Sequence, residues 1–508
     1  MTSEAFRRQL RREAETWQKQ GWITAEQFEQ LADYYQFNRL ETGARDRFVL
    51  VLVSLGSLLL GIGAITFVAA NWQAISREGK LALLFTLFLS VNILGHQLWR
   101  RPPFTLPVVE PAANDPHSPP TAGQRSHPYR RERWQNRLGH ALLLLGALLL
   151  GANIALTGQL FHISGSAYDL CFAWGIGVLA MAYGLRLTSL GMMAIALVGL
   201  GYWLSIQDMS MMGVPSSLAR VLEYMPLLAG GAFLPLAYVC RSRVIFAGMT
   251  IAVFSSFAVV MADLTRLFPN GSGLLLAIAL VLPPALLWSY DDSPWRRLLH
   301  RPAVSAQPFR STAQGLALVW LVLLLGTLAF HWVWPLQPER PSLSQQASHL
   351  FTTGLPLLLN PNVLVLTLLT LIGWVHLAYS QRRHRWSLIA ADVIVLLFLG
   401  LTALVIIWHW SIFPIQWVAT YIMNLMFFLL AVGFLRQGLG QGNRPLFWCG
   451  LVMVTLQILS RTLEYDTGLL LKSLIFILCG LGVMLIGLWF ERYVRTLTPP
   501  QDSSSLPS

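Results

Sequence analysis

Charged residues are scarce in this sequence of 508 residues. Asp, Glu, Lys and Arg make up 12% of it, whereas 55% of the residues are hydrophobic and the mean hydropathy is +0.55. An ordinary soluble domain carries about 25% charged residues. The shortage of charge therefore excludes a soluble globular protein and predicts one that lies in a membrane.

Cysteine is also rare, and the common enzyme motifs are missing. The four cysteines lie in apolar runs with no CxxC spacing, so they indicate neither a disulfide framework nor a zinc site. The sequence contains no GxxxxGK[ST] phosphate loop, no HExxH and no GxSxG. We therefore assign no catalytic residue, metal or cofactor, and we do not expect an enzyme.

Long apolar runs fill most of the chain. A bilayer core about 30 Å thick needs about 20 mostly apolar residues per helix. The predicted fold class is an all-α polytopic integral membrane protein of about fourteen transmembrane helices. The predicted spans are 48–70, 79–98, 138–160, 167–185, 187–205, 223–240, 242–262, 273–290, 313–334, 361–380, 387–410, 413–435, 445–460 and 469–490.

Lysine and arginine give the predicted orientation, because these residues are enriched in cytoplasmic loops. With the N-terminus inside, only seven of the 36 basic residues fall in outer segments: Arg77, Lys80, Arg220, Arg266, Arg340, Arg461 and Lys472. This asymmetry predicts that both termini are cytoplasmic. It also accounts for the net charge of +12 through anionic lipid at the cytoplasmic face, so we expect a lipid-bilayer partner and no nucleic acid.

Five segments follow from composition: an amphipathic cytoplasmic helical hairpin at 1–46, two spans at 47–98, a disordered basic, proline-rich cytoplasmic linker at 99–137, a twelve-span bundle at 138–491 and a disordered tail at 492–508. In the hairpin, Gly21 is the expected C-cap of one helix. Thr24 is the N-cap of the next, with Gln27 completing a capping box. Two roles fit the hairpin: a docking module, or a helix pair lying against lipid headgroups.

Two stretches in the predicted first and third spans are nearly identical: LGSLLLG at 55–61 and LGALLLG at 145–151. In each, a small residue stands four positions before a glycine, as Ser57 with Gly61 and Ala147 with Gly151. This spacing lets two membrane helices approach closely. The pattern fits a parallel repeat such as some transporters contain, and equally a chance match between Leu-rich spans.

A family resemblance rests on the same region. The run LGSLLLGIGAITFVAANW, preceded by GWITAEQ and followed by LLGANIALTGQLFHISG, resembles the bacterial membrane family called domain of unknown function 2157 (DUF2157). The resemblance covers roughly residues 1–200. Residues 461–492 resemble more faintly the end of a second such family, DUF4401. Both families are predicted multi-pass membrane proteins. The resemblance therefore implies a location in the bacterial plasma membrane, but it does not indicate which activity the protein has.

Ionisable groups inside a membrane are costly and are therefore candidates for function. Asp392 is the one carboxylate well inside a predicted span, and His376 lies near the inner end of the preceding span. An antiparallel hairpin would place the two at similar depth, as a candidate intramembrane pair that handles protons or solute. The alternative is a structural hydrogen bond between helices, or Asp392 capped by Arg385.

Other polar residues gather at the predicted outer ends of spans. Asn71, Gln159, His162 and Asp169 form a candidate outer-face polar cluster, with His331 and His409 at the same level. His and Asp side chains that converge could bind a polar headgroup, a sugar or a metal. The alternative is that they have no binding role, because the outer ends of membrane helices are commonly polar. Asn424 and Gln457 lie instead in the middle of predicted spans, where they fit a polar path or interhelical hydrogen bonds. Arg461, Glu464 and Asp466, near Lys472, are expected to form an exposed charge cluster at an outer loop with weak ion pairs.

Three hypotheses for function follow. The first is a secondary transporter or flippase-like carrier of a polar or lipid-linked solute. The second is a non-catalytic envelope or scaffold protein that recruits partners through its cytoplasmic N-terminus. The third is a membrane transferase dependent on Asp169 or Asp263. Span number and Asp392 favour the first, and the sequence identifies no protein partner.

Overall fold

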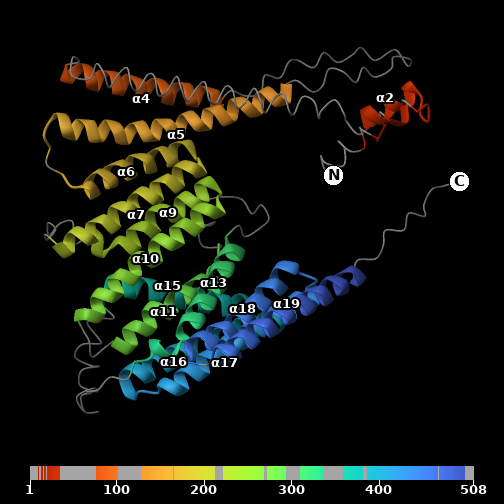
Figure 1. Ribbon diagram of the computed structural model, residues 1–508. Helices are drawn as coiled ribbons and strands as arrows, with labels where there is room; N and C mark the ends of the chain where they lie inside the picture. The colour runs from red at the N-terminus through yellow and green to blue at the C-terminus, as the bar shows by residue number, and fades with distance from the viewer. Residues whose placement is uncertain are drawn as a thin grey trace. The chain divides into compact units, whose positions relative to one another are not determined.

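The computed structural model describes residues 10, 13–14, 16–18, 20–34, 76–100, 128–163, 165–211, 221–267, 272–292, 309–335, 359–381, 386–466 and 468–497. The described residues contain helices and no strand (Figure 1). The helices are α2 (Ala25–Tyr34), α4 (Arg77–Arg100), α5 (Pro128–Leu160), α6 (Ala167–Leu185), α7 (Thr188–Met211), α9 (Met225–Cys240), α10 (Arg243–Leu267), α11 (Ser272–Trp288), α13 (Arg310–Leu328), α15 (Pro361–Gln381), α16 (Trp386–Ile407), α17 (Gln416–Gln441), α18 (Arg444–Glu464) and α19 (Leu469–Leu497), with a 3-10 turn η2 (His331–Val333) and a π-helical turn η3 (Trp408–Ile412).

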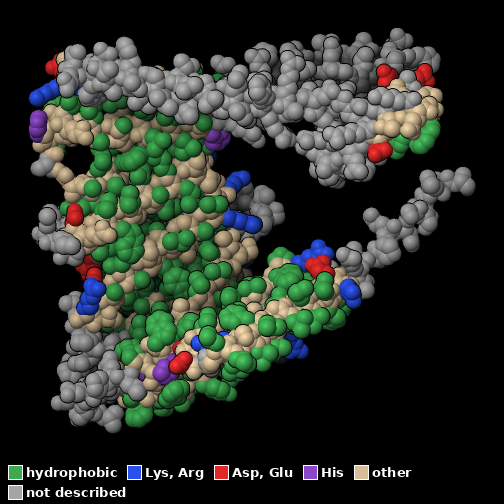
Figure 2. Space-filling view, in the orientation of Figure 1, with side chains coloured by type: hydrophobic (Ala, Val, Ile, Leu, Met, Phe, Trp, Pro, Cys, Tyr) green, Lys and Arg blue, Asp and Glu red, His purple; other side chains and the backbone are tan. Residues whose placement is uncertain are grey.

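The helices confirm a polytopic membrane protein. Eleven of those described are long and apolar enough to cross a membrane, and the shorter α9 and α11 are also apolar. Each of these helices lies at one of the predicted spans, whereas the span at 48–70 lies outside the described residues, so the count of fourteen stays a prediction. Figure 2 shows hydrophobic side chains over most of the visible face of the described helices, as expected for surfaces that contact lipid.

Several helices extend past the predicted segment boundaries. α5 begins at Pro128, inside the segment expected to be a disordered linker up to 137, and α19 continues to Leu497, into the expected tail. Hydropathy marks where a helix leaves the hydrocarbon and does not mark where its hydrogen bonding ends. Pro128 also suits the first position of a helix, because its ring fixes φ and its missing N–H is not needed there.

The chain forms two compact units, 1–94 with 159–163, and 95–158 with 164–508. In the first unit, the predicted cap of α2 is present: Thr24 N donates to Gln27 Oε1 at 3.0 Å, and Gln27 N donates to Thr24 Oγ1 at 3.3 Å. Gly21, expected as a C-cap, has φ +75°. The start of α2 is therefore as predicted.

In the second unit, α11 is central and packs against α10, α13, α15 and α16. Its interior holds Pro283 and Pro284. Pro284 has no N–H for the carbonyl of Leu280, and Trp320 Nε1 of α13 donates to that carbonyl at 3.3 Å. A neighbouring helix thus satisfies the backbone group that the proline leaves open, which a lipid environment requires.

α17 and α18 form a tight hairpin that positions the candidate site. Gly442, at φ +61°, ends α17, and the side chain of Asn443 caps α18. A Cβ on Gly438 would lie 2.5 Å from Phe447 N, and one on Gly450 would lie 2.9 Å from a carbonyl of α17. Only glycine allows this close packing of the two backbones, so the hairpin has a fixed register.

Candidate functional site

The predicted intramembrane pair receives other partners in the structure. His376 Nδ1 lies 3.1 Å from Asp291 Oδ2, just beyond the end of α11. Asp392, which is 8% exposed, accepts a hydrogen bond of 2.8 Å from Trp288 Nε1. Both residues therefore bind the same end of α11, His376 from α15 and Asp392 from α16. Asp291 comes directly after the predicted span 273–290 and so counted as a loop residue rather than as an intramembrane carboxylate.

The same end of α11 carries a second carboxylate, Asp292, which is fully buried. Its Oδ2 accepts the backbone N–H groups of Phe309 and Arg310, both at 3.2 Å, at the start of α13. Its Oδ1 accepts the hydroxyl of Tyr238 at 2.5 Å, so Tyr290, 2.6 Å from Tyr238, donates to that hydroxyl in turn. A carboxylate at a helix N-terminus meets free N–H groups and the positive end of the helix dipole. We call these residues the Asp292 network; its fully paired bonds indicate a structural role.

The predicted outer-face cluster stays a prediction as one set, because its members lie partly outside the described residues and partly in two separate units. Asn71 lies outside them. Gln159 and His162 belong to the first unit, where His162 adopts a left-handed φ of +51° and its N–H donates to Gln159 O at 3.4 Å. Asp169 belongs to the second unit and caps α6, accepting from Ser166 N at 3.0 Å and Ser166 Oγ at 2.8 Å.

Of the residues predicted to pack helices together, Ser57 and Gly61 lie outside the described residues. Ala147 is fully buried, and its carbonyl accepts a 2.7 Å hydrogen bond from Trp174 Nε1 of α6. A Cβ on Gly151 would clash with the Trp174 ring. The second copy of the repeat therefore lies against α6.

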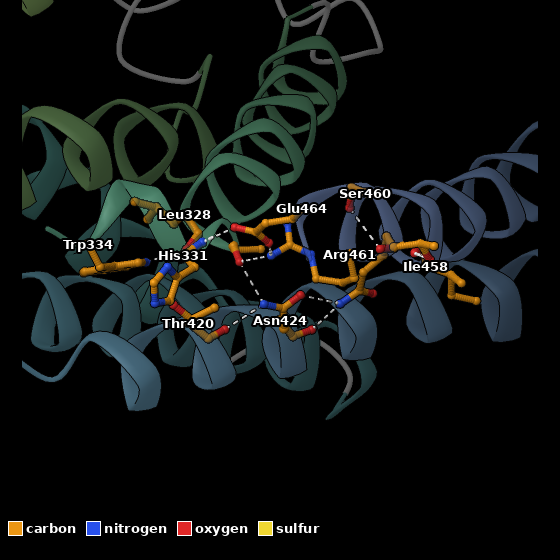
Figure 3. A network of polar contacts seen from close by, with 12 residues as sticks. Leu328, His331, Trp334, Thr420, Asn424, Ile458, Ser460, Arg461 and Glu464 are labelled. Atoms are coloured by element: carbon orange, nitrogen blue, oxygen red, sulfur yellow. Dashed lines mark hydrogen bonds and ion pairs between the residues drawn. The ribbon is translucent and has the colours of Figure 1, made fainter. Parts of the chain in front are cut away.

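A denser group of polar contacts joins the ends of α13 and α18 to the start of α17 (Figure 3). Arg461 Nη1 donates to Ala329 O, the carbonyl at the C-cap of α13, at 2.5 Å, and forms an ion pair with Glu464. The other oxygen of Glu464 accepts His331 N at 2.5 Å. Asn424 Nδ2 donates to the same Ala329 carbonyl at 2.9 Å. We call these residues, together with Gln457, the Arg461 network.

The expectation of an exposed, weak pair was wrong for Arg461 and Glu464. Their side chains are 18% and 10% exposed. Phe330 covers the guanidinium, with its ring centre 4.3 Å from Cζ. A cation at a helix C-terminus is also favoured by the helix dipole. Charges counted along a loop could not indicate this burial, because the covering carbonyl and ring belong to Ala329 and Phe330, just past α13 and more than a hundred residues earlier.

Gln457 and Asn424 link α18 to α17 below the ion pair. Gln457 Nε2 donates to Asn424 O at 2.7 Å and to Asn424 Oδ1 at 3.3 Å. At the helical rise, Gln457 lies about 10 Å along α18 from Glu464, and Asn424 about 12 Å along α17 from Gln416. Interhelical hydrogen bonds were one of the two roles predicted for these residues. The polar groups extend well inside the apolar helices.

A groove of about 450 Å³ lies beside this network, between α17 and α18. Arg461, Gln457, Asn424 and Thr462 supply its polar lining. Its apolar lining is Tyr421, Leu425, Phe428, Val454 and Ile458. Leu425, Phe428 and Ile458 remain 43–45% exposed, so the groove opens sideways between two membrane helices. Its size falls within the usual range for a small-ligand site, about 300–1,000 Å³.

Among the described residues, the hydrogen bonds leave particular atoms of the groove-lining side chains without a partner. Both bonds of Arg461 use Nη1, whereas Nε is buried with no hydrogen-bond partner among the described residues. Within the described part of the chain, Nη2 also lacks an acceptor, and Gln457 Oε1 lacks a donor. The site therefore offers two donors on one edge of a cation and one acceptor nearby. No group of three or more His, Cys, Asp or Glu side chains suited to a metal occurs among the residues that the structure describes.

Fold and site together define a multi-pass helical membrane protein with a mainly apolar groove, backed by a few polar side chains, between two of its helices. Comparison with known families agrees: residues 15–191 match the family described as predicted membrane protein (DUF2157). The match ends before α9, so α17, α18 and the groove lie outside it. No curated protein and no solved structure matches the chain. The resemblance of residues 461–492 to DUF4401 stays a prediction.

Proposed function

We propose that the protein is a flippase-like carrier that takes an amphipathic, lipid-linked solute from the bilayer into the groove between α17 and α18. The observation that carries the proposal is the groove itself, which opens between apolar helices and is backed by Arg461, Gln457 and Asn424. Polar and ionisable side chains are costly at lipid-facing positions unless they serve a site or a helix contact. An apolar entrance with a polar wall suits an amphipathic ligand, which has an apolar part and a polar part.

The two polar networks support movement across the bilayer. The Asp292 network lies at the start of α13 and the Arg461 network at its end, about 28 Å apart along the helix axis. This separation is close to the thickness of the hydrocarbon core. With fourteen spans and cytoplasmic termini, the Arg461 network faces the outer leaflet of a bacterial plasma membrane. Asp392, buried at the opposite end, is the candidate for coupling to protons.

A lipid-scrambling assay tests the proposal. Purified protein is reconstituted into phosphatidylcholine vesicles with a trace of phosphatidylglycerol that carries a nitrobenzoxadiazole (NBD) fluorophore. Dithionite then bleaches probe in the outer leaflet. Wild-type protein is expected to expose inner-leaflet probe faster than protein-free vesicles do.

Two matched variants connect the activity with the groove. Ile458→Trp fills the groove and is expected to slow exchange severalfold. Leu456→Trp, on the same helix at an exposed position outside the groove, is expected to leave it unchanged. Equal slowing by both variants, or wild-type vesicles no faster than empty ones, would contradict the proposal and favour the scaffold hypothesis for the N-terminal hairpin.

A further inference from the structure

We infer that the groove between α17 and α18 binds the phosphate of an anionic phospholipid on the Nε and Nη2 edge of Arg461, with the acyl chains along the apolar lining. This inference rests on the proposed carrier function and names its ligand class. It concerns binding, which can be measured separately from transport.

The donor geometry of Arg461 supports a phosphate. The N–H of Nε and one N–H of Nη2 point from the same edge of the guanidinium plane, and this edge forms two parallel bonds to oxygens of one phosphate. Neither atom has an acceptor in the described part of the chain, whereas Nη1 on the other side has two. Within the described chain, the Nε and Nη2 edge of the guanidinium therefore has no acceptor.

Glu464 does not repel an anion from this edge by direct contact. One of its oxygens binds Arg461 Nη1, and the other accepts His331 N–H. Glu464 is absent from the groove lining, whereas Arg461 is part of it. Glu464 therefore holds the guanidinium through Nη1, and the Nε and Nη2 edge stays without an acceptor in the described chain on a residue that lines the groove.

The network also holds most of the buried side-chain atoms that lack a hydrogen-bond partner in the described chain. Three buried side-chain atoms lack a hydrogen-bond partner among the residues that the structure describes, and two of them, Arg461 Nε and His331 Nε2, belong here. Such atoms are rare in folded proteins and commonly indicate a missing ligand or water. Gln457 Oε1 adds an acceptor for a headgroup hydroxyl beside the phosphate.

The surroundings favour a lipid over a free phosphate ion. Arg461 lies about 4.5 Å along α18 from its last residue, a depth near the headgroup level. The apolar lining continues from there along Leu425 and Phe428 on the lipid-facing surface. A free phosphate ion would make no favourable contact with this apolar lining, whereas the acyl chains of a lipid would pack against it. Basic pockets between membrane helices are known headgroup sites in general.

Native mass spectrometry of the full-length protein in detergent tests the inference. The protein is titrated with dioleoyl-phosphatidylglycerol and, in parallel, with a glucosyl-diacylglycerol of the same chains, which lacks phosphate. We expect the phosphatidylglycerol to bind about tenfold or more tightly, since a charge-assisted bidentate contact contributes at least that factor. Glycerol 3-phosphate is expected to compete poorly.

Variants assign the contact to Arg461. The double variant Arg461→Gln with Glu464→Gln removes both charges together and leaves no buried charge unpaired. It is expected to bind both lipids equally. Ile458→Trp leaves the polar contacts in place and is expected to weaken both lipids. Equal binding of the two lipids by wild type, an unchanged preference in the double variant, or displacement by millimolar glycerol 3-phosphate would each overturn the inference.

Failure of this inference and failure of the carrier function have different signatures. Selective phosphatidylglycerol binding without faster probe exchange would sustain the site and contradict the carrier. Groove-dependent exchange that is the same for phosphatidylglycerol and glucosyl-lipid probes, and unaffected by the double variant, would sustain the carrier and contradict the phosphate site.

Discussion

The buried ion pair between Arg461 and Glu464 gives the sharpest energetic prediction. Either single change, Arg461→Gln or Glu464→Gln, leaves one charge in a site where the side chains are only 18% and 10% exposed. Such a change costs about 3–5 kcal/mol of unfolding free energy, because the remaining charge has lost its partner. The amide that Glu464→Gln introduces still offers an oxygen to His331 N–H, so that bond contributes little to the difference.

The double variant carries no charge at this position. We expect it to be no less stable than either single variant, which gives a coupling energy of about 3 kcal/mol or more. Equilibrium unfolding in mixed detergent micelles, followed by tryptophan fluorescence, measures all four forms.

A matched control lies on α10, where Arg266 and Asp263 form a pair of the same sequence separation with side chains 80% and 60% exposed. The cycle of Arg266→Gln and Asp263→Asn is expected to give less than about 1 kcal/mol. Coupling of the Arg461 pair no larger than that of this control would refute the reasoning, because it would mean that water reaches the site freely.

Three further predictions concern the hairpin and the other end of the bundle. Asp292→Asn replaces one of two acceptor oxygens with a donor, so it should lower the unfolding free energy by about 1–3 kcal/mol. Asp291→Asn, whose His376 partner is 42% exposed, should cost less than half as much in the same assay; equal losses would contradict this. Gly438→Ala should reduce thermal stability in detergent because its Cβ meets the backbone of Phe447, whereas Gly440→Ala, with open space around it, should raise it slightly; a gain at both positions would remove the close contact from the account. Asp392→Asn keeps an oxygen for Trp288 Nε1 and should leave protein abundance intact, while any dependence of probe exchange on a pH gradient should disappear; an unchanged pH response would exclude Asp392 from coupling.

The helices could be predicted from sequence because their cause is local. A run of about 20 apolar residues must satisfy its own backbone in lipid, and only a helix does so within one segment. Even the shortest of the predicted spans, 445–460, lies within a continuous helix, α18, from Arg444 to Glu464. The ends of α5 and α19 were missed because polar helical turns outside the hydrocarbon carry no hydropathy signal.

The site could be predicted only in part, because its contacts join distant segments. The sequence indicated Asp392 and His376 as costly residues and placed Asn424 and Gln457 inside the membrane. It could not indicate that Asp392 and His376 bind residues at the end of α11 instead of each other: Asp392 binds Trp288, and His376 binds Asp291. Nor could it show that the carbonyl of Ala329 and the ring of Phe330 bury Arg461. The sequence pattern indicates how deep a residue lies in the membrane. Which residue of another helix it contacts depends on how the helices pack.

The most direct test of the carrier account is the extent of probe exchange as a function of the number of protein copies per vesicle. NBD-phosphatidylglycerol vesicles are prepared over a range of protein-to-lipid ratios and bleached with dithionite. The account predicts that the accessible fraction rises from about half, the outer leaflet alone, toward complete bleaching as every vesicle acquires a copy. An accessible fraction that stays at the protein-free value at every ratio, with the protein shown to be folded and inserted, would contradict it.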